Sequence, residues 1–97
     1  MSVYVIAGLN IHDEAHYEDY ATRALVSLEK YKVEVLVVSD APVAVEGVNP
    51  YRRYVVLKFP DQAAFDTWYH SAEYQSAMPI RHEAAETGFF VTVNGLG

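Results

Sequence analysis

Residues 3–9 read VYVIAGL, a β-branched and apolar run of strand length that Asn10 closes. Apolar residues occupy both of its faces: Val3, Val5, Ala7 and Leu9 lie on one, and Tyr4 and Ile6 on the other. A strand in an antiparallel sheet covered on one side normally alternates apolar and polar residues, and this strand does not. The stretch therefore predicts a strand that is buried on both faces.

Helix and strand signals alternate along the rest of the chain. A helix is expected from its N-cap, Asp13, to about residue 31, because apolar residues recur there every three or four positions. A second helical stretch follows the cap Asp61 and ends at Thr87-Gly88, with Ser71 and Pro79 as alternative points of division. Strands are expected over residues 33–39, 51–59 and 89–93, with a short alternating segment over residues 43–46.

This order of elements predicts one α+β domain over residues 1–97. Two strand–helix–strand units in so short a chain fit a ferredoxin-like sandwich, a four-stranded antiparallel sheet with both helices on one face. A chain of this length buries roughly 65% of the surface that its unfolded form exposes, which is enough for one core. No repeat or low-complexity tract interrupts it.

The predicted sheet is too apolar to stand alone. In the second strand Val33, Val35 and Val37 oppose Leu36 and Val38, and in the last strand Phe89, Val91 and Val93 oppose Phe90 and Thr92. Two helices cover only one face, so the other would be a larger apolar patch than a soluble monomer usually exposes. We expect a second copy to bury this face by two-fold pairing, which makes the protein a homodimer through its sheet. The alternative is that the helical turns after Ser71 wrap round and cover the face.

Composition and charge exclude several classes of protein. The chain has no cysteine, which excludes disulfides, a thiol nucleophile and cysteine-based zinc or iron–sulfur sites. Its net charge of −6 argues against a nucleic-acid partner. No apolar run approaches the roughly 20 residues that span a bilayer, so no membrane partner is expected. Residues 1–4 carry no basic leader, and we therefore expect a cytoplasmic location.

The chain also carries a series of short motifs in a fixed order. They include Tyr4-Val5-Ile6-Ala7, Ala41-Pro42-Val43, Phe59-Pro60-Asp61 and, most specifically, residues 68–75 (WYHSAEYQ) followed by Pro79-Ile80-Arg81. In this order they resemble the small bacterial family called domain of unknown function 1330, over nearly the whole chain. The resemblance implies a ferredoxin-like subunit that pairs sheet to sheet as a dimeric α/β barrel. No common activity is established for the family, so the resemblance implies no catalytic residues.

Two positions depart from the pattern of that family. The family usually has small residues, often two glycines, after the first helix, where this chain has Lys32-Val33-Glu34. It commonly has proline at the position of Ala72. Both departures concern the local geometry of a loop or turn.

Three residues of the second helical stretch are candidates for catalysis: His70, Tyr74 and Arg81. An imidazole that titrates near neutral pH suits proton transfer, and a fixed guanidinium suits carboxylate binding. In an enzyme, His70 would be the proton shuttle, Tyr74 the donor and Arg81 the anion holder. The structural alternative is that Arg81 pairs with Glu73, Glu83 or a backbone carbonyl and shapes the end of the sheet.

Aromatic residues supply the candidate pocket, which we expect to include Tyr4, Tyr54, Trp68 and Tyr69. Tyr4 and Tyr54 lie on predicted strands and would point together into the barrel interior or into the core. Trp68 and Tyr69, like Tyr17 and Tyr20, recur at helical spacing, a pattern that is more often part of a core than of a pocket.

Two charged patterns are interpreted as surface features. His12 and His16 have the spacing of a helical zinc-binding pair, but His12 precedes the predicted cap and no third ligand is evident. We therefore expect no metal and no cofactor. Arg52-Arg53 is too small for a nucleic-acid footprint and is interpreted as charge at a strand edge.

Three functions remain open at this point. The first is a homodimer that binds a small, partly apolar molecule, either between the sheets or beneath residues 68–81. The second is a cofactor-independent enzyme, similar to the monooxygenases and isomerases of the dimeric barrel fold, acting on a small aromatic or polyketide-like compound. The third is a structural or interaction dimer whose interior is filled.

Overall fold

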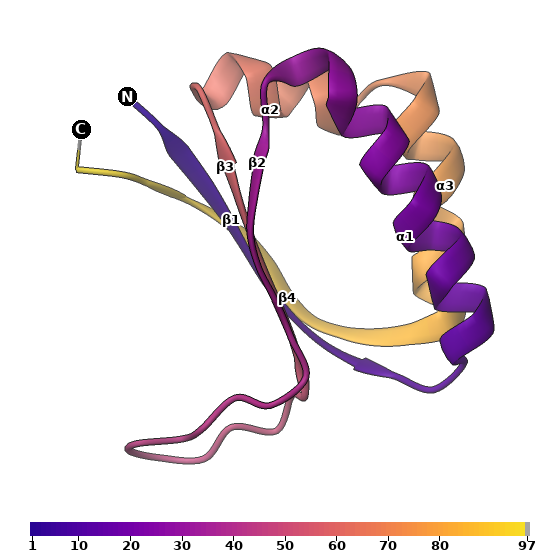
Figure 1. Cartoon of the computed structure of the whole chain (residues 1–97), viewed down its shortest axis with the longest axis vertical. Coiled ribbons are helices and arrows are strands. Elements are labelled where there is room, and N and C mark those ends of the chain that lie inside the picture. Colours follow the sequence, from indigo (N-terminus) through magenta and orange to yellow (C-terminus); the bar gives the residue numbers. More distant parts are fainter. Residues whose placement is uncertain (97) are drawn as a thin grey trace.

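The computed structural model describes residues 1–96 as a four-stranded antiparallel sheet with its helices on one face (Figure 1). The elements are β1 (Val3–Ile11), α1 (Glu14–Leu28), the short 3-10 helix η1 (Glu29–Tyr31), β2 (Glu34–Ser39), β3 (Arg53–Phe59), α2 (Gln62–Tyr69), α3 (Ala72–Ala84) and β4 (Ala85–Asn94). The strands lie in the order β2-β3-β1-β4, the order of a ferredoxin-like sandwich. The α+β class and the ferredoxin-like architecture predicted from the sequence are confirmed.

Capping side chains determine where the helices begin. Asp13 Oδ1 accepts a hydrogen bond from the backbone N of His16 at 3.1 Å, and Asp61 Oδ1 accepts one from Ala64 at 2.8 Å. Ser71 Oγ caps α3 by accepting from the backbone N of Tyr74 at 3.2 Å, so the second helical stretch divides at Ser71. Pro79 lies within α3.

The chain leaves α1 through η1 and a left-handed residue. Lys32 has φ 52° and ψ 43°, and it is the one non-glycine residue with positive φ among residues 1–96. This conformation costs an L-residue about 1–2 kcal/mol, because Cβ approaches the following carbonyl oxygen. The geometry explains why small residues suit this position, where the chain carries lysine.

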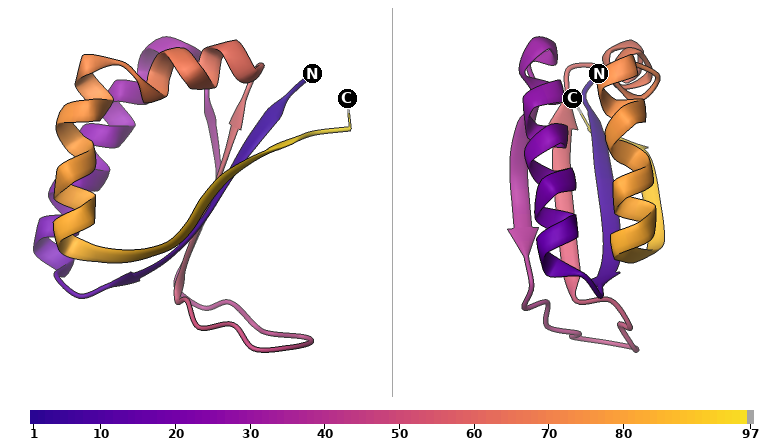
Figure 2. Two further views of the ribbon diagram at one scale, coloured as in Figure 1. Left: turned by 180° about the vertical axis from the view of Figure 1, so that it is seen from behind. Right: turned by 90° about the vertical axis from the view of Figure 1, so that its right-hand side faces the viewer.

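The predicted strand segment over residues 43–46 is wrong, because these residues belong to a long loop between β2 and β3. β2 pairs directly with β3, so no strand lies beside the segment to pair with it. The loop extends beyond the end of the sheet in Figure 1 and in both views of Figure 2. We call residues 40–52 the arm. Val43, Val45 and Val48 at its tip are 84%, 90% and 94% exposed.

The predicted helix stop at Thr87-Gly88 is also wrong. α3 ends at Ala84 and β4 starts at once, because β4 pairs with β1 as far as Ile11 and Ala85. Gly88 marks a β-bulge instead: Gly8 pairs with Phe89 and Leu9 with Thr87, which leaves Gly88 as the extra residue. A Cβ on Gly88 would overlap the ring of Tyr51, so the close approach of the ring needs a glycine there.

The residues of β1 divide between the two faces of the sheet as predicted. Val3, Val5, Ala7 and Leu9 face the helices, and each is at most 2% exposed. The opposite side of the sheet, which we call the open face, carries Tyr4, Ile6, Tyr54, Val56, Phe89, Val91 and Val93, as the strand registers require. The helices α1, α2 and α3 lie on the other side of the sheet (Figure 2). The alternative in which the turns after Ser71 cover the open face is therefore wrong.

A second bulge changes the faces of β2. Val35 pairs with Leu57 and Val37 with Val56, so Leu36 is the extra residue between them. The bulge places Val38 opposite Val55 and breaks the simple alternation. The predicted grouping of Val35 with Val37 is wrong for this reason, and Val35 lies with Val38 on the helix side.

Candidate functional site

A cavity of about 180 Å³ lies between α1 and the helix side of the sheet. Its walls come from β1, β2, β3 and α1, and they are completed by Trp68 of α2, Arg81 of α3 and Phe90 of β4. Small side chains leave the space open, because the lining includes Ala7, Ala21 and Ala24 where larger residues would fill it. The walls are almost entirely apolar.

The cavity opens toward solvent between α1 and the edge strand β2. Leu25 of α1 and Val35 and Val38 of β2 all line it, and they are 53%, 44% and 60% exposed. β2 is an outer strand of the sheet. Val35 and Val38 therefore form part of the rim of the pocket, and they also lie at the edge of the sheet.

Two charged residues line the cavity, and they have different environments. Arg53 forms an ion pair with Asp40: its Nε donates to Oδ1, and its Nη2 donates to Oδ2 at 2.9 Å. This hydrogen bonding raises the pKa of Arg53 and lowers the pKa of Asp40. The guanidinium also lies 5.5 Å from the ring centroid of Tyr17. Since β3 is an inner strand, the interpretation of Arg53 as strand-edge charge is wrong.

Arg81 is only 4% exposed and has no carboxylate partner among residues 1–96. Its Nη2 donates to Nε2 of His82 at 3.2 Å, while its Nε and Nη1 are buried without an acceptor. The guanidinium carbon lies 4.7 Å from the ring centroid of Phe90 and 5.8 Å from that of Tyr20.

The carboxylates considered as partners of Arg81 are engaged elsewhere. Glu73 accepts from Nζ of Lys30 at 3.1 Å, and Glu83 lies 3.5 Å from Nε2 of His16. The alternative in which Arg81 pairs with Glu73 or Glu83 is therefore wrong.

Two buried phenols lie beside Arg81. The hydroxyls of Tyr20, which lines the cavity, and Tyr74 are 2.9 Å apart and share a hydrogen bond. Burial raises the pKa of Tyr74, and it raises the pKa of Tyr20 well above its ordinary value. Both side chains are therefore neutral at neutral pH and are able to donate a hydrogen bond.

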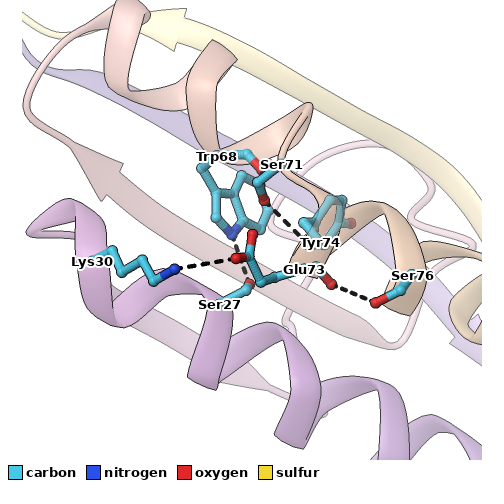
Figure 3. A network of polar contacts seen from close by, with 7 residues as sticks. All are labelled: Ser27, Lys30, Trp68, Ser71, Glu73, Tyr74 and Ser76. Atoms are coloured by element: carbon cyan, nitrogen blue, oxygen red, sulfur yellow. Dashed lines mark hydrogen bonds and ion pairs between the residues drawn. The ribbon is translucent and has the colours of Figure 1, made fainter.

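A polar network fixes Trp68 in the cavity wall (Figure 3). Its Nε1 donates to Ser27 Oγ at 2.8 Å, and Ser27 Oγ donates to the carbonyl of Ala24 at 2.6 Å. The Trp68 ring packs on Tyr74 with centroids 4.0 Å apart. The Lys30–Glu73 ion pair, which joins η1 to α3, lies beside this network. The network gives Trp68 one orientation relative to α1.

The structure brings some of the expected site residues together. Trp68 and Arg81 line the cavity. Tyr74 does not line it, but it shares a hydrogen bond with Tyr20, which does. His70 is exposed at the end of α2, where its Nδ1 lies 2.9 Å from the carbonyl oxygen of Asp66, and it does not line the cavity.

The other expected pocket residues lie outside this cavity. Tyr69 packs edge-on against Trp68, and its hydroxyl donates to Met78 Sδ at 3.4 Å. Tyr4 and Tyr54 lie on the open face, where Tyr54 Oη donates to Asn49 Oδ1 at 2.7 Å. Sequence reasoning missed Arg53 as a lining residue and treated Tyr20 as core. The small residues Ala7, Ala21 and Ala24 were the feature of the sequence that could have indicated a cavity.

The histidine pair does not form a metal site. His12 precedes α1, while His16 faces Glu83. Within residues 1–96, no group of three or more His, Cys, Asp or Glu side chains is placed to hold a metal ion. No helix in that part of the chain is long and apolar enough to cross a membrane.

The fold and the cavity define a ferredoxin-like α+β protein with a pocket between its helices and its sheet. The chain belongs to the family described as "Domain of unknown function (DUF1330)", whose pattern matches residues 2–96. The resemblance seen in the sequence motifs is confirmed. No curated protein matches the chain.

Solved structures share the fold at low sequence identity. A protein of unknown function from Rhodopseudomonas palustris superposes with a TM-score of 0.82 at 14% identity, covering 99% of this chain and 83% of the other. SnoaB, a cofactor-independent oxygenase from Streptomyces nogalater, gives 0.69 at 10% identity, covering 99% and 94%. A dimeric ferredoxin-like protein of unknown function from Jannaschia gives 0.65 at 17% identity, covering 98% and 100%.

Proposed function

We propose that the protein is a homodimer and that each subunit binds a small, partly apolar molecule in the cavity between α1 and the sheet. The observation that carries the proposal is the open, apolar cavity of about 180 Å³. A cavity of about 150 Å³ with apolar walls accommodates a benzene molecule. The space therefore suits a body the size of one aromatic ring, with longer substituents leaving through the opening beside β2.

Dimerisation is supported by the open face. Val91 and Val93 are each 44% exposed, and they lie in one layer with Ile6 and Val56. A contiguous apolar face of this kind is usually an interface. The arm adds exposed valines that a second copy would shelter, and a structural neighbour is a dimeric ferredoxin-like protein. In such a dimer Tyr4 and Tyr54 would belong to the interface between the two sheets.

The dimer proposal is tested by light scattering after size-exclusion chromatography. Val91→Glu puts a charge on the open face and should convert the dimer into a monomer. Val26→Glu is the matched control, because Val26 is 59% exposed on α1, away from the open face. A wild-type protein that runs as a monomer at micromolar concentration contradicts the proposal, as does a dimer that Val91→Glu leaves intact.

The binding proposal is tested by native mass spectrometry and fluorescence. Native spectra report a co-purified small molecule and the number of subunits together. Trp68 is the one tryptophan of the chain and lines the cavity, so its emission reports on occupancy. A cavity that takes up no small aromatic compound favours instead a structural or interaction dimer.

A second candidate function is a cofactor-independent enzyme acting on a small aromatic or polyketide-like compound. The observation that favours it is the hydrogen-bonded Tyr20–Tyr74 pair beside Arg81, since neutral phenol donors and a cation suit the stabilisation of an anionic intermediate. The SnoaB neighbour is a cofactor-independent oxygenase. Loss of turnover in Arg81→Ala and Tyr74→Phe would support it, once a substrate is found. His70→Ala tests the proton-shuttle role proposed for His70 in the same assay.

A further inference from the structure

We infer that the molecule bound in the cavity is a small carboxylic acid and that its carboxylate binds to Arg81. The inference rests on the proposed function, in which the cavity takes up a small molecule, and it names the chemical class of that molecule. It starts from the two buried donors of Arg81 that have no acceptor, Nε and Nη1.

A buried cation without a counter-ion is unfavourable, so its presence needs a reason. A charged group loses its hydration when it leaves water; aromatic rings compensate for part of the loss, and hydrogen bonds and an opposite charge compensate for most of it. Arg81 contacts the imidazole of His82 and has two aromatic rings around it. Arg53, the other cation that lines the cavity, already has Asp40. Arg81 is therefore the lining cation that is free to bind an anion.

A second subunit on the open face would not supply the missing carboxylate. Arg81 belongs to α3 and packs over Phe90, which pairs with Ala7 on the helix side of the sheet. The open face lies on the other side of the same sheet. A ligand in the cavity is placed to reach Arg81, because Arg81 lines that cavity.

The lining also selects the charge and the size of the ligand. Within residues 1–96 no aspartate or glutamate lines the cavity, so a cationic amine would find no counter-ion there. The chain carries a net charge of −6, which repels anions in general, so selectivity for an acid must come from this site. The apolar walls and the volume of about 180 Å³ suit a one-ring body next to the carboxylate.

The first experiment compares benzoate with benzamide, a neutral molecule of nearly the same shape. Binding is measured by isothermal titration calorimetry and by the emission of Trp68. A charge-assisted contact with a buried guanidinium should make benzoate bind about 10- to 100-fold more tightly than benzamide.

Variants of Arg81 then assign the preference to this residue. Arg81→Met keeps the length of the side chain and removes the charge, so the preference for benzoate should disappear while benzamide still binds. The unliganded variant should be at least as thermostable as the wild type, because an unpaired buried charge is gone. Arg23→Met is the control: Arg23 is an exposed arginine of α1 that pairs with Asp19, and its loss should leave both affinities unchanged.

The outcomes separate the two proposals. Equal binding of benzoate and benzamide, or a preference that persists in Arg81→Met, overturns the carboxylate inference and leaves the binding function standing. Failure of both probes to bind overturns the inference and counts against the proposed function as well. A melting temperature of Arg81→Met several degrees below that of the wild type would show that Arg81 stabilises the empty protein, and this also overturns the inference.

Discussion

Removing either hydroxyl of the Tyr20–Tyr74 pair should destabilise the fold, and removing both should cost less than the sum of the single losses. The two oxygens are 2.9 Å apart, and Tyr20 and Tyr74 are 7% and 0% exposed. Tyr20→Phe therefore leaves the hydroxyl of Tyr74 buried without its partner, and Tyr74→Phe does the same to Tyr20. Leaving one buried polar group unsatisfied costs about 1–3 kcal/mol.

The double variant removes both polar groups, so no hydroxyl is left unsatisfied. The coupling energy between the two positions should therefore be about 1–2 kcal/mol. For a domain of this size, 1 kcal/mol corresponds to roughly 4–8 °C in melting temperature, which makes each single variant easy to measure.

The assay is urea unfolding of the four proteins at one protein concentration, followed by circular dichroism. Tyr31→Phe is the control, because the Tyr31 hydroxyl has no hydrogen-bond partner within residues 1–96, and its loss should change stability little. Additive losses in the double variant would refute the reasoning, since additivity means that the two hydroxyls do not share a bond.

Three further predictions concern the single residues Ser27, Lys32 and Tyr20. Ser27→Ala should lower the free energy of unfolding by about 1–3 kcal/mol in urea titrations, because Trp68 Nε1 loses its buried acceptor; an unchanged midpoint contradicts this. Lys32→Gly should raise the melting temperature by a few degrees and Lys32→Ala should not, because only glycine adopts φ 52° without strain; equal effects would exclude strain as the cause. Because burial raises the pKa of Tyr20, its contribution to stability is fully present below about pH 10 and is lost as pH rises toward the pKa of the folded state. The urea midpoint of the wild type should therefore fall more steeply above pH 10 than that of Tyr20→Phe, and parallel pH profiles would contradict the shift.

The elements that were predicted well are those whose signals are local. Asp13 and Asp61 were predicted as helix caps, and both cap helices in the structure. The prediction is local, because a cap needs only a side chain that reaches two or three residues ahead. Simple alternation also separated the two faces of β1, and the structure showed which of them the helices cover. The wrong predictions concern segments whose structure depends on pairing with a distant strand. Gly88 resembles a helix stop in the sequence, but β4 pairs with β1 on both sides of it. Residues 43–46 have strand propensity, but no described strand pairs with them.

The candidate site was predicted in part. Trp68, Tyr74 and Arg81 were singled out from the sequence, and the structure groups them at one cavity through direct contacts and through Tyr20. Arg53 was interpreted as charge at a strand edge, but its pairing with Leu9 places it on the helix side of an inner strand, where it lines the cavity. His70 was a candidate in the same helical stretch as Tyr74, but Ser71 starts a new helix between them and His70 is exposed.

The sequence by itself determined the family, the order of the four main strands and of the helical stretches between them, and a sheet with two apolar faces, because motif order, periodicity and strand alternation are properties of neighbouring residues. Only the tertiary structure decided that α1 stands away from β2 over small side chains and leaves a cavity there. It also decided that Arg81 lines that space and that two of its buried donors have no acceptor among residues 1–96. A cavity remains only if no surrounding element fills it, and a charge stays unpaired only if no surrounding element supplies a partner. No local stretch of sequence contains that information.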